Sequence, residues 1–166
     1  MFEIVRRNLS KIEASRLVQE MRDFPDIVYF SESHLCHLPH TFVAEFDGQF
    51  AGVCGVYEIG TWIKLGPLVV LQEYHGRGLG RALIDVILQH YPSHNYLIIS
   101  SNKIVQRIAL TSGFAECRSF FALPNIVKFA LARQLVHMLN TRLILEKIRK
   151  SIHYKRGPMR WYVRYN

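Results

Sequence analysis

The chain has 166 residues, of which 49% are hydrophobic and 20% are charged, which suits one compact domain with a sizeable core. No uncharged apolar run approaches the roughly 18 residues of a membrane span, and residues 1–7 read as a short strand rather than a secretory signal. Cys36, Cys54 and Cys117 are scattered, which predicts a reducing, cytoplasmic location, and the net charge of +8 arises in the last quarter of the chain.

The first 40 residues predict a strand and a helix. Residues 2–7 alternate in polarity and predict the strand. Ser10 and Glu13 have the spacing of a capping box, and the apolar stripe that follows predicts a helix to about residue 23. Residues 23–40 are bracketed by prolines and predict a loop with a short helix. A cluster of potential metal ligands in this segment lacks a CxxC pair or a second ligand pair, so no metal site is predicted: His34, Cys36, His37 and His40.

Three strands and a helix are predicted next. Residues 41–46 and 50–58 alternate on either side of Asp47-Gly48, which is a strong signal for a β-hairpin. Residues 62–71 predict another strand, locally distorted because a Gly-Pro pair interrupts its hydrogen-bonding ladder. Residues 78–91 predict a helix that Pro92 stops.

A glycine-rich turn joins the strand at 62–71 to this helix. Gly76, Gly78 and Gly80 stand at alternate positions before the apolar helical stripe. Such a turn presents unpaired backbone N–H groups at the positive end of a helix dipole, which suits a phosphate or pyrophosphate. No Lys follows as in a Walker loop, and the third glycine of a dinucleotide fingerprint is absent. The remaining pattern is His75-x-x-Gly78-x-Gly80.

A second strand-to-helix unit follows. Residues 95–100 predict a central buried strand, and residues 103–112 predict a helix. Asn102 stands at the start of this helix, and Gly113-Phe114 closes it. Residues 115–123 predict a further strand.

The C-terminal segment is apolar at helical spacing and strongly basic. Residues 126–152 predict one long amphipathic helix, or two with a break, whose apolar face includes Leu131, Leu135 and Met138. A Gly-Pro pair ends it, and residues 160–165 predict a last strand. Residues 126–166 hold 10 Lys and Arg against a single acid. Such a segment attracts nucleic acid, anionic membranes or acidic ligands, but no recognised nucleic-acid-binding motif accompanies it.

The two glycine motifs together resemble the GNAT acetyltransferase superfamily. Its acyl-CoA pyrophosphate loop is usually written Arg/Gln-x-x-Gly-x-Gly/Ala, and its next helix typically starts at Asn and ends at Gly-Phe. The resemblance covers residues 41–122 well. It implies an α/β (α+β) fold with a mixed, mostly antiparallel sheet of about seven strands and flanking helices. The last two strands would be separated by a helical insertion at 126–157.

The same resemblance implies acetyl-CoA as cosubstrate. The strand before the loop would offer backbone groups to the pantetheine arm, the loop amides would hold the pyrophosphate, and Asn102 would lie beside the pantetheine. The implied donor-binding residues are Val69, Val70, His75, Gly76, Arg77, Gly78, Leu79, Gly80, Arg81 and Asn102. The two arginines add charge against phosphate or are simply solvated.

The acid and base of the family do not carry over. Many members have a Tyr four residues before the Gly of the Gly-Phe pair as the acid, but this chain has Ala109. Some have a Glu as base where Lys64 stands here, and a protonated Lys cannot be that base, although it could hold an acceptor's carboxylate. Glu58, near the end of the preceding strand, is the best available carboxylate. His75 replaces the usual Arg or Gln of the loop.

We therefore predict one acetyltransferase domain over residues 1–166 that transfers an acetyl group directly from acetyl-CoA to an amine. The acceptor is a small molecule or peptide, and the basic insertion favours an anionic one over a Lys-rich protein tail. An alternative is a catalytically weak protein that binds acyl-CoA as a sensor or docks on a partner through its basic C-terminal helix. Ala109 keeps this alternative open.

Overall fold

The computed structural model describes residues 1–24, 30–137 and 157–166 of the chain. Its strands are β1 (Phe2–Arg6), β2 (His40–Phe46), β3 (Gln49–Ile59), β4 (Trp62–Val70), β5 (Asn95–Ser100), β6 (Ala115–Cys117) and β7 (Arg160–Arg164). Its α-helices are α1 (Lys11–Asp23), α2 (Glu32–Cys36), α3 (Leu79–His90), α4 (Lys103–Thr111) and α5 (Asn125–His137). Two 3-10 helices, η1 (Gln72–Tyr74) and η2 (Phe120–Ala122), lie in the connections.

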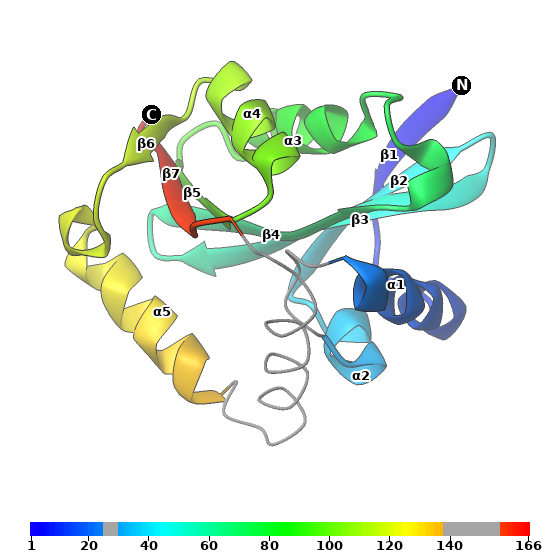
Figure 1. The fold of residues 1–166 in the computed structure, drawn as a ribbon, viewed down its shortest axis with the longest axis horizontal. Coiled ribbons are helices and arrows are strands. Elements are labelled where there is room, and N and C mark those ends of the chain that lie inside the picture. The colour runs from blue at the N-terminus through cyan, green and yellow to red at the C-terminus, as the bar shows by residue number, and fades with distance from the viewer. Residues whose placement is uncertain (25–29, 138–156) are drawn as a thin grey trace.

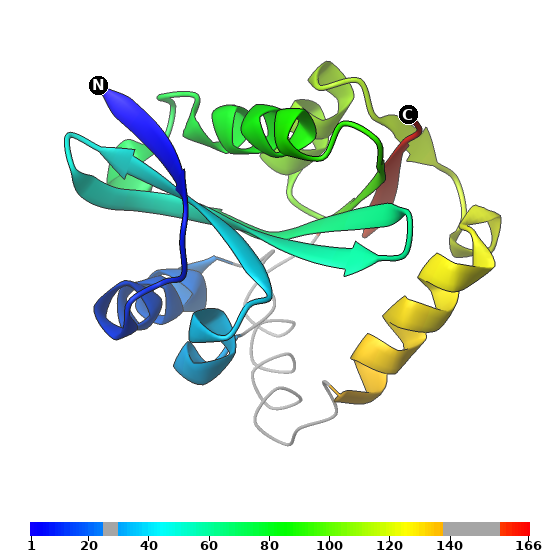
Figure 2. The same ribbon diagram turned by 180° about the vertical axis from the view of Figure 1, so that it is seen from behind.

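Within these residues, seven strands form one sheet in the order β1-β2-β3-β4-β5-β7-β6. Only the β4–β5 pair is parallel; the other neighbours are antiparallel. α3 and α4 cover one face, and α1, α2 and α5 lie on the other (Figure 1), as the view from behind also shows (Figure 2). The predicted mixed, mostly antiparallel sheet with flanking helices is confirmed.

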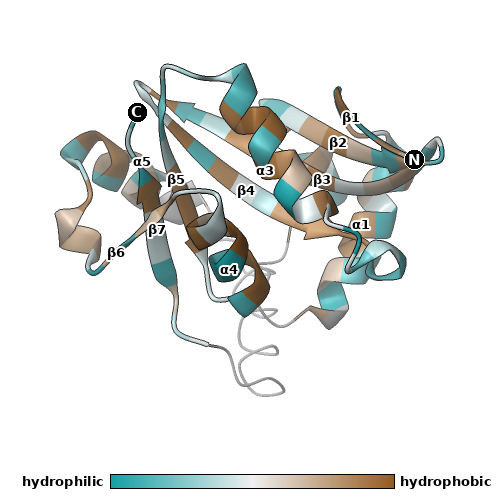
Figure 3. Ribbon diagram, turned by 90° about the horizontal axis from the view of Figure 1, so that it is seen from above, coloured by the Kyte–Doolittle hydropathy of each residue, from teal (hydrophilic) through white to brown (hydrophobic). Residues whose placement is uncertain are grey.

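Each face of the sheet buries apolar side chains against its helices. Viewed onto α3 and α4, hydrophobic segments alternate with hydrophilic ones along both helices, as amphipathic surface helices require (Figure 3). Beneath the opposite face, α5 contributes Val127 and Leu131 to a second cluster with Trp62, Leu97 and Val163. Among the described helices, none is both long and apolar enough to cross a bilayer.

Local sequence signals placed most elements correctly. The Asp47-Gly48 turn joins β2 to β3 with both residues in the left-handed region, at φ 49° and 75°, which matches the twist of a tight hairpin. The first part of the predicted C-terminal helix is present as α5. The rest of that helix, with Met138, lies outside the described residues, as does the side chain of Leu135.

The predicted strand at 115–123 is wrong beyond its first three residues, Ala115–Cys117. β6 ends at Cys117, which pairs with Trp161 at the start of β7. Only Arg160 of β7 precedes Trp161, so among the residues that the structure describes β6 has almost no partner to continue along. Ser119 instead accepts a hydrogen bond from the Phe121 amide through its hydroxyl and caps η2. Side chain-to-backbone bonds of this kind compete with a strand ladder.

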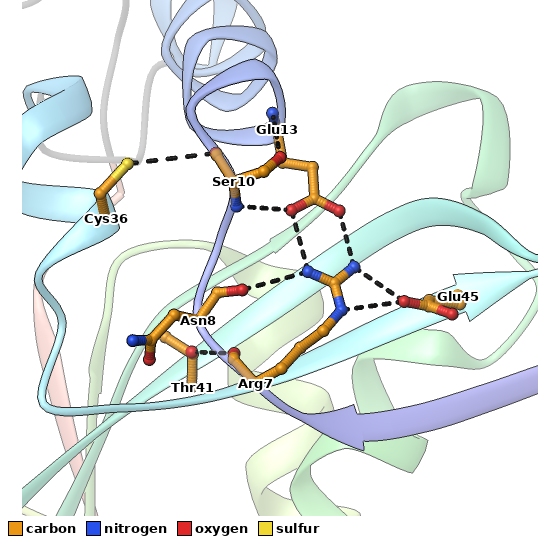
Figure 4. Close-up of polar contacts among 7 residues, drawn as sticks. All are labelled: Arg7, Asn8, Ser10, Glu13, Cys36, Thr41 and Glu45. Carbon is orange, nitrogen blue, oxygen red and sulfur yellow. Dashed lines mark hydrogen bonds and ion pairs between the residues drawn. The ribbon is translucent and has the colours of Figure 1, made fainter.

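An ion-pair network fixes α1 to the sheet (Figure 4). Arg7 donates to both carboxylate oxygens of Glu13, at 2.6 and 2.9 Å, and to Glu45 on β2, at 2.7 and 3.0 Å. Glu13 also accepts from the Ser10 amide while Ser10 accepts from the Glu13 amide, which confirms the predicted capping box. Thr41 donates its hydroxyl to the Arg7 carbonyl. The Arg7 guanidinium holds the pKa of Glu13 below its ordinary value.

Candidate active site

A bulge in β4 divides that strand into two parts. Val56 of β3 pairs with Leu65 of β4, but Cys54, two residues earlier on β3, pairs with Leu68, three residues later on β4. One extra residue therefore lies in β4 around Gly66 and Pro67, where the sequence predicted a distortion. The backbones approach closely here, because a Cβ on Gly55 would lie 2.9 Å from the Gly66 carbonyl oxygen.

The bulge changes which residues of β4 point to which face. Paired residues share a face and neighbours alternate, so Trp62 and Lys64 point toward the α1, α2 and α5 side before the bulge. Beyond it, Leu68 and Val70 point toward α3 and α4 and remain half-buried. After the bulge, β4 thus has half-buried side chains on the α3–α4 face. Before the bulge, it has the half-buried Lys64 on the opposite face.

β4 and β5 part at the same place. Their parallel pairing runs from Trp62 and Asn95 to Leu65 and Ile98 and then ends. Farther along, the described part of β4 pairs with β3, and that of β5 with β7. The inner backbone edges of residues 66–70 and 99–100 therefore face an opening in the sheet. A strand edge of this kind offers N–H and C=O groups to a ligand.

The glycine turn begins where the open edge of β4 ends. Gly76 and Gly78 are left-handed, at φ 76° and 79°, and a Cβ on either would meet nothing within 4 Å. Gly78 is the N-cap of α3 and supplies no side-chain hydrogen bond, and no acid lies in the first turn. The first intrahelical amide is that of Ala82, which donates to the Gly78 carbonyl. The amides of the first turn are thus available to an anion.

Gly80 has a different role. A Cβ there would lie 3.3 Å from Ile108 Cδ1 on α4 and 3.9 Å from Val70 Cγ2. This glycine allows α3, α4 and the end of β4 to approach one another. Leu79 beside it is buried, and Val69 is buried on β4. These three residues can reach a donor only through their backbones.

The polar side chains of His75, Arg77 and Arg81 in the turn all have protein partners. His75 bonds through Nε2 to the Val70 carbonyl, at 2.8 Å, and stacks on Phe24. Arg77 lies over the Phe46 ring, with its guanidinium carbon 4.5 Å from the centroid. Arg81 contacts Asp85 Oδ2 and the Thr111 carbonyl oxygen, each at 3.4 Å. The structure brings these predicted residues to one turn, and their contact with a donor stays a prediction.

Asn102 stands across the opening from β4, at the end of β5. Its Oδ1 accepts from the amides of Ile104 and Val105, at 2.8 and 3.3 Å, and caps α4. Ala109 lies later on α4 and is fully buried. Its carbonyl accepts hydrogen bonds from the amides of Ser112 and Phe114. Position 109 thus offers no hydroxyl.

A cluster of three titratable side chains lies on the opposite face of the sheet. Tyr57 of β3 and Lys64 of β4 are cross-strand partners, and the Lys64 ammonium lies 4.7 Å from the centroid of the Tyr57 ring. His34 of α2 meets the Tyr57 hydroxyl through Nε2 at 3.1 Å. Phe30 packs on the His34 ring, with centroids 5.3 Å apart. We call His34, Tyr57 and Lys64 the donor-rich cluster.

Burial disfavours charge throughout this cluster. It lowers the pKa of Lys64 to about 8 and raises the pKa of Tyr57 to about 12. Burial, followed by the nearby charge of Lys64, lowers the pKa of His34. Counting back from the β3–β4 turn predicts that Tyr57 and Lys64 pair, so the sequence held a signal for that contact. It held none for His34, which tertiary packing brings from α2.

Glu58 lies on the face that carries α3 and α4. Its cross-strand partner is Ile63, which shares its face. Lys64 is the next residue on β4, so the side chains of Glu58 and Lys64 point to opposite faces. Glu58 contacts His40 Nε2 at 3.3 Å and interacts with Tyr91 at the C-terminus of α3. The glycine turn is at the other end of this helix, about 18 Å away along 12 residues. A role of Glu58 as base stays a prediction.

Two further groups are accounted for by their surroundings. Cys54 is fully buried beside the bulge, and burial raises the pKa of its thiol to about 12. It therefore remains a protonated, inert side chain at neutral pH. In the segment around α2, His34, His37 and His40 bond to different partners. Among the described residues, no three His, Cys, Asp or Glu side chains gather as a metal site.

Comparison with known proteins agrees with this geometry. The family model described as "Acetyltransferase (GNAT) family" matches residues 3–114. No curated protein sequence matches the chain. Among solved structures, Rv2747 from Mycobacterium tuberculosis, in complex with CoA and NLQ, is similar with a TM-score of 0.67 at 12% identity. The match covers 98% of this chain and 99% of that one.

Two other similar structures are named for small-molecule enzymes. Diaminobutyrate acetyltransferase EctA from Paenibacillus lautus, with L-2,4-diaminobutyric acid and coenzyme A, has a TM-score of 0.60 at 12% identity, covering 98% of this chain and 95% of that one. N-acetylglutamate synthase from Neisseria gonorrhoeae, with coenzyme A and N-acetyl-glutamate, has a TM-score of 0.65 at 14% identity. That match covers 98% of this chain, which spans 35% of the synthase. At these identities the likeness concerns the fold.

Proposed function

This chain belongs to the GNAT acetyltransferase family, whose members use acetyl-CoA, and we propose that it transfers the acetyl group directly to an amine of a small acceptor. One observation carries the proposal. The open edge of β4 leads from the bulge at Gly66 to an uncapped helix N-terminus with two left-handed glycines. An extended arm that ends in a pyrophosphate fits such a track, because strand-edge groups and helix amides bind its two parts separately.

The donor would be held mainly by backbone groups. The amides from Gly76 to Arg81 would accept the pyrophosphate, and the edge of β4 at Val69 and Val70 would align the pantetheine arm. Open space beside Gly76 and Gly78 supports this assignment. Asn102 would act through the start of α4, which it caps, rather than through its occupied Oδ1. Arg77 could reach phosphate only by leaving the Phe46 ring.

Direct transfer is favoured over an acyl-enzyme. The amine must be neutral, the thioester carbonyl must be polarised, and the departing thiolate needs a proton. Cys54, the cysteine beside the bulge, is buried and protonated and makes a poor acyl carrier. Backbone amides at the bulge would polarise the carbonyl. Ala109 cannot supply the proton, so we propose water for that step.

The acceptor is proposed to be small and anionic. The comparison enzymes named for diaminobutyrate and glutamate act on amino acids, and residues 126–166 carry 10 Lys and Arg against one acid. A basic surround raises the local concentration of anions and speeds their encounter. A Lys-rich protein tail would be repelled. We retain the cytoplasmic location as part of the proposal.

A second candidate function is an acyl-CoA sensor that does not turn over. The buried alanine at position 109 favours it, because the usual acid is missing. Release of free thiol from acetyl-CoA, measured with and without a panel of free amino acids, diamines and short peptides, separates the two. Acceptor-dependent thiol release supports the transferase. Tight acetyl-CoA binding without release from any acceptor would support the sensor.

A further inference from the structure

The donor-rich cluster lies where an acceptor would meet the donor. Lys64 precedes the bulge by two residues, and its pairing with Leu97 is next to the last β4–β5 pair, Leu65 with Ile98. Its side chain points to the face opposite α3 and α4. A donor entering from the α3–α4 face beyond the bulge would therefore present its acyl end beside this cluster.

The chemistry of the cluster suits an anion. Lys64 supplies an ammonium, Tyr57 a phenol hydroxyl and His34 an imidazole, drawn from β4, β3 and α2. Tyr57 and Lys64 are half-buried, so interactions there are screened less than at the surface. The Lys64 ammonium disfavours a positive charge on the His34 imidazole. A bound anion would relieve that repulsion and accept hydrogen bonds from several donors.

We propose that His34, Tyr57 and Lys64 hold the carboxylate of an amino-acid acceptor and direct its amine toward the bulge of β4. A carboxylate has one charge and two acceptor oxygens, which match the Lys64 ammonium and the one donor that the hydrogen-bonded His34–Tyr57 pair leaves free. Lys64 and Gly66 are only two residues apart along β4, so a ligand that reaches from one to the other must be short. An amino acid meets this condition, because its carboxylate and amine are a few bonds apart. This proposal rests on the proposed transferase function and names its substrate class.

The test compares acids with their carboxamides. Free amino acids, diaminobutyric acid included, and the matching carboxamides are assayed as acceptors by thiol release. The wild-type protein should prefer the acid by at least about tenfold in kcat/KM, because the amide lacks the charge that Lys64 binds. Lys64→Met should remove most of that preference, chiefly by raising KM for the acid.

Three further variants sharpen the result. Tyr57→Phe keeps the ring and removes one donor, so it should raise KM for the acid less than Lys64→Met does. Lys64→Arg keeps the charge and should retain part of the preference. Lys11→Met removes an exposed cation from α1 and should leave the preference intact. Thermal melting and acetyl-CoA affinity establish that each variant is folded.

Failure of the site and failure of the transferase give different results. Turnover without a preference for acids, or a preference that survives in Lys64→Met, overturns the carboxylate site and leaves the transferase standing. Calorimetry with CoA in place of acetyl-CoA measures amino-acid binding without reaction. Binding that depends on Lys64 without any turnover supports the site and overturns the transferase. If the protein neither binds nor acetylates any amino acid, the carboxylate site is overturned as well.

Discussion

Arg7 and Glu13 are the residues whose interaction gives the clearest dependence of stability on pH. Glu13 has a lowered pKa in the folded protein because Arg7, then Ser10, bond to its carboxylate. A lowered folded pKa means that the carboxylate contributes its full stabilisation above the unfolded value of 4.5 and loses it as the pH falls through the folded value.

We predict that Glu13→Gln lowers the free energy of unfolding at pH 7 by about 1–2 kcal/mol, from the lost ion pair and capping bond. The gap to wild type should narrow as the pH falls below 4.5, where the unfolded chain takes up the proton first, and should close as the pH falls through the lowered folded pKa of Glu13. Thermal melting from pH 7 to pH 3 measures this. Glu32→Gln, on the exposed first turn of α2, is the control. A constant gap across this range would contradict the assigned role.

Gly78 tests where the donor's pyrophosphate binds. Its φ of 79° is one that Asn and Asp tolerate better than other side chains, and a Cβ there meets nothing within 4 Å. An Asp at this N-cap would place its own carboxylate at the helix amides, which stabilises the helix and competes with a bound anion.

We expect Gly78→Asp to weaken acetyl-CoA binding at least tenfold more than Gly78→Asn, about 1.4 kcal/mol. The two side chains share shape and backbone strain and differ in charge, so calorimetry on the pair isolates the electrostatic effect. Equal affinities would place the pyrophosphate elsewhere. Gly80 is a poorer site for this test, because a Cβ there would lie only 3.3 Å from Ile108 Cδ1.

Individual residues differ in how far the sequence specifies their contacts. The pairing of Ser10 with Glu13 is a local signal and was predicted correctly. The face on which Glu58 lies depends on the strand pairing of β3 and β4, so its position opposite Lys64 emerged only from the fold. Arg81 meets Asp85 at the local i,i+4 spacing, but its Thr111 partner comes from α4 and the Phe46 partner of Arg77 comes from β2. Such long-range contacts leave no mark at fixed spacing along the chain.

At the scale of elements, α5 shows how one helix serves two surroundings. Leu131 is buried against the sheet, with 8% of its surface exposed, whereas Phe129 on the outer side is 74% exposed. The predicted apolar face is therefore present in the described part of the helix. Met138, the third residue named for that face, lies outside the described residues.

We predict that Leu131→Ala lowers the free energy of unfolding by about 2–3 kcal/mol, because it leaves a cavity beside Trp62 and Leu97. Phe129→Ala, on the same helix, should change it by less than about 0.5 kcal/mol. Chemical denaturation measures both. Similar losses from the two variants would show that α5 packs differently from the structure described above.

Elements defined by local signals were predicted better than those limited by a partner. The β2–β3 hairpin follows from Asp47-Gly48 and alternating side chains, and both strands were found. The end of β6 at Cys117 depends on where β7 starts, more than 40 residues later. The sequence at 118–123 is apolar enough for a strand, and its periodicity does not show where the neighbouring strand begins.

At the scale of the whole molecule, the proposed binding sites for donor and acceptor lie on opposite faces of the sheet. The splay of β4 from β5 opens the sheet at the bulge, with the glycine turn on one side and the donor-rich cluster on the other. The mixed sheet and the glycine turn could be predicted because two motifs stand in order on strand-to-helix units. The donor-rich cluster could not be predicted, because its residues come from three elements and because the face to which Lys64 points depends on how β4 is paired.

The central claim is that this chain moves an acetyl group from acetyl-CoA to an amine. Its most direct test is mass spectrometry of the acceptor, combined with titration of free thiol, in reactions with purified protein, acetyl-CoA and single amino acids. We predict one N-acetylated acceptor for each thiol released, with both products reduced together in Gly78→Asp. Thiol release without an acetylated amine, or no release with any acceptor at saturating acetyl-CoA, would contradict the assignment.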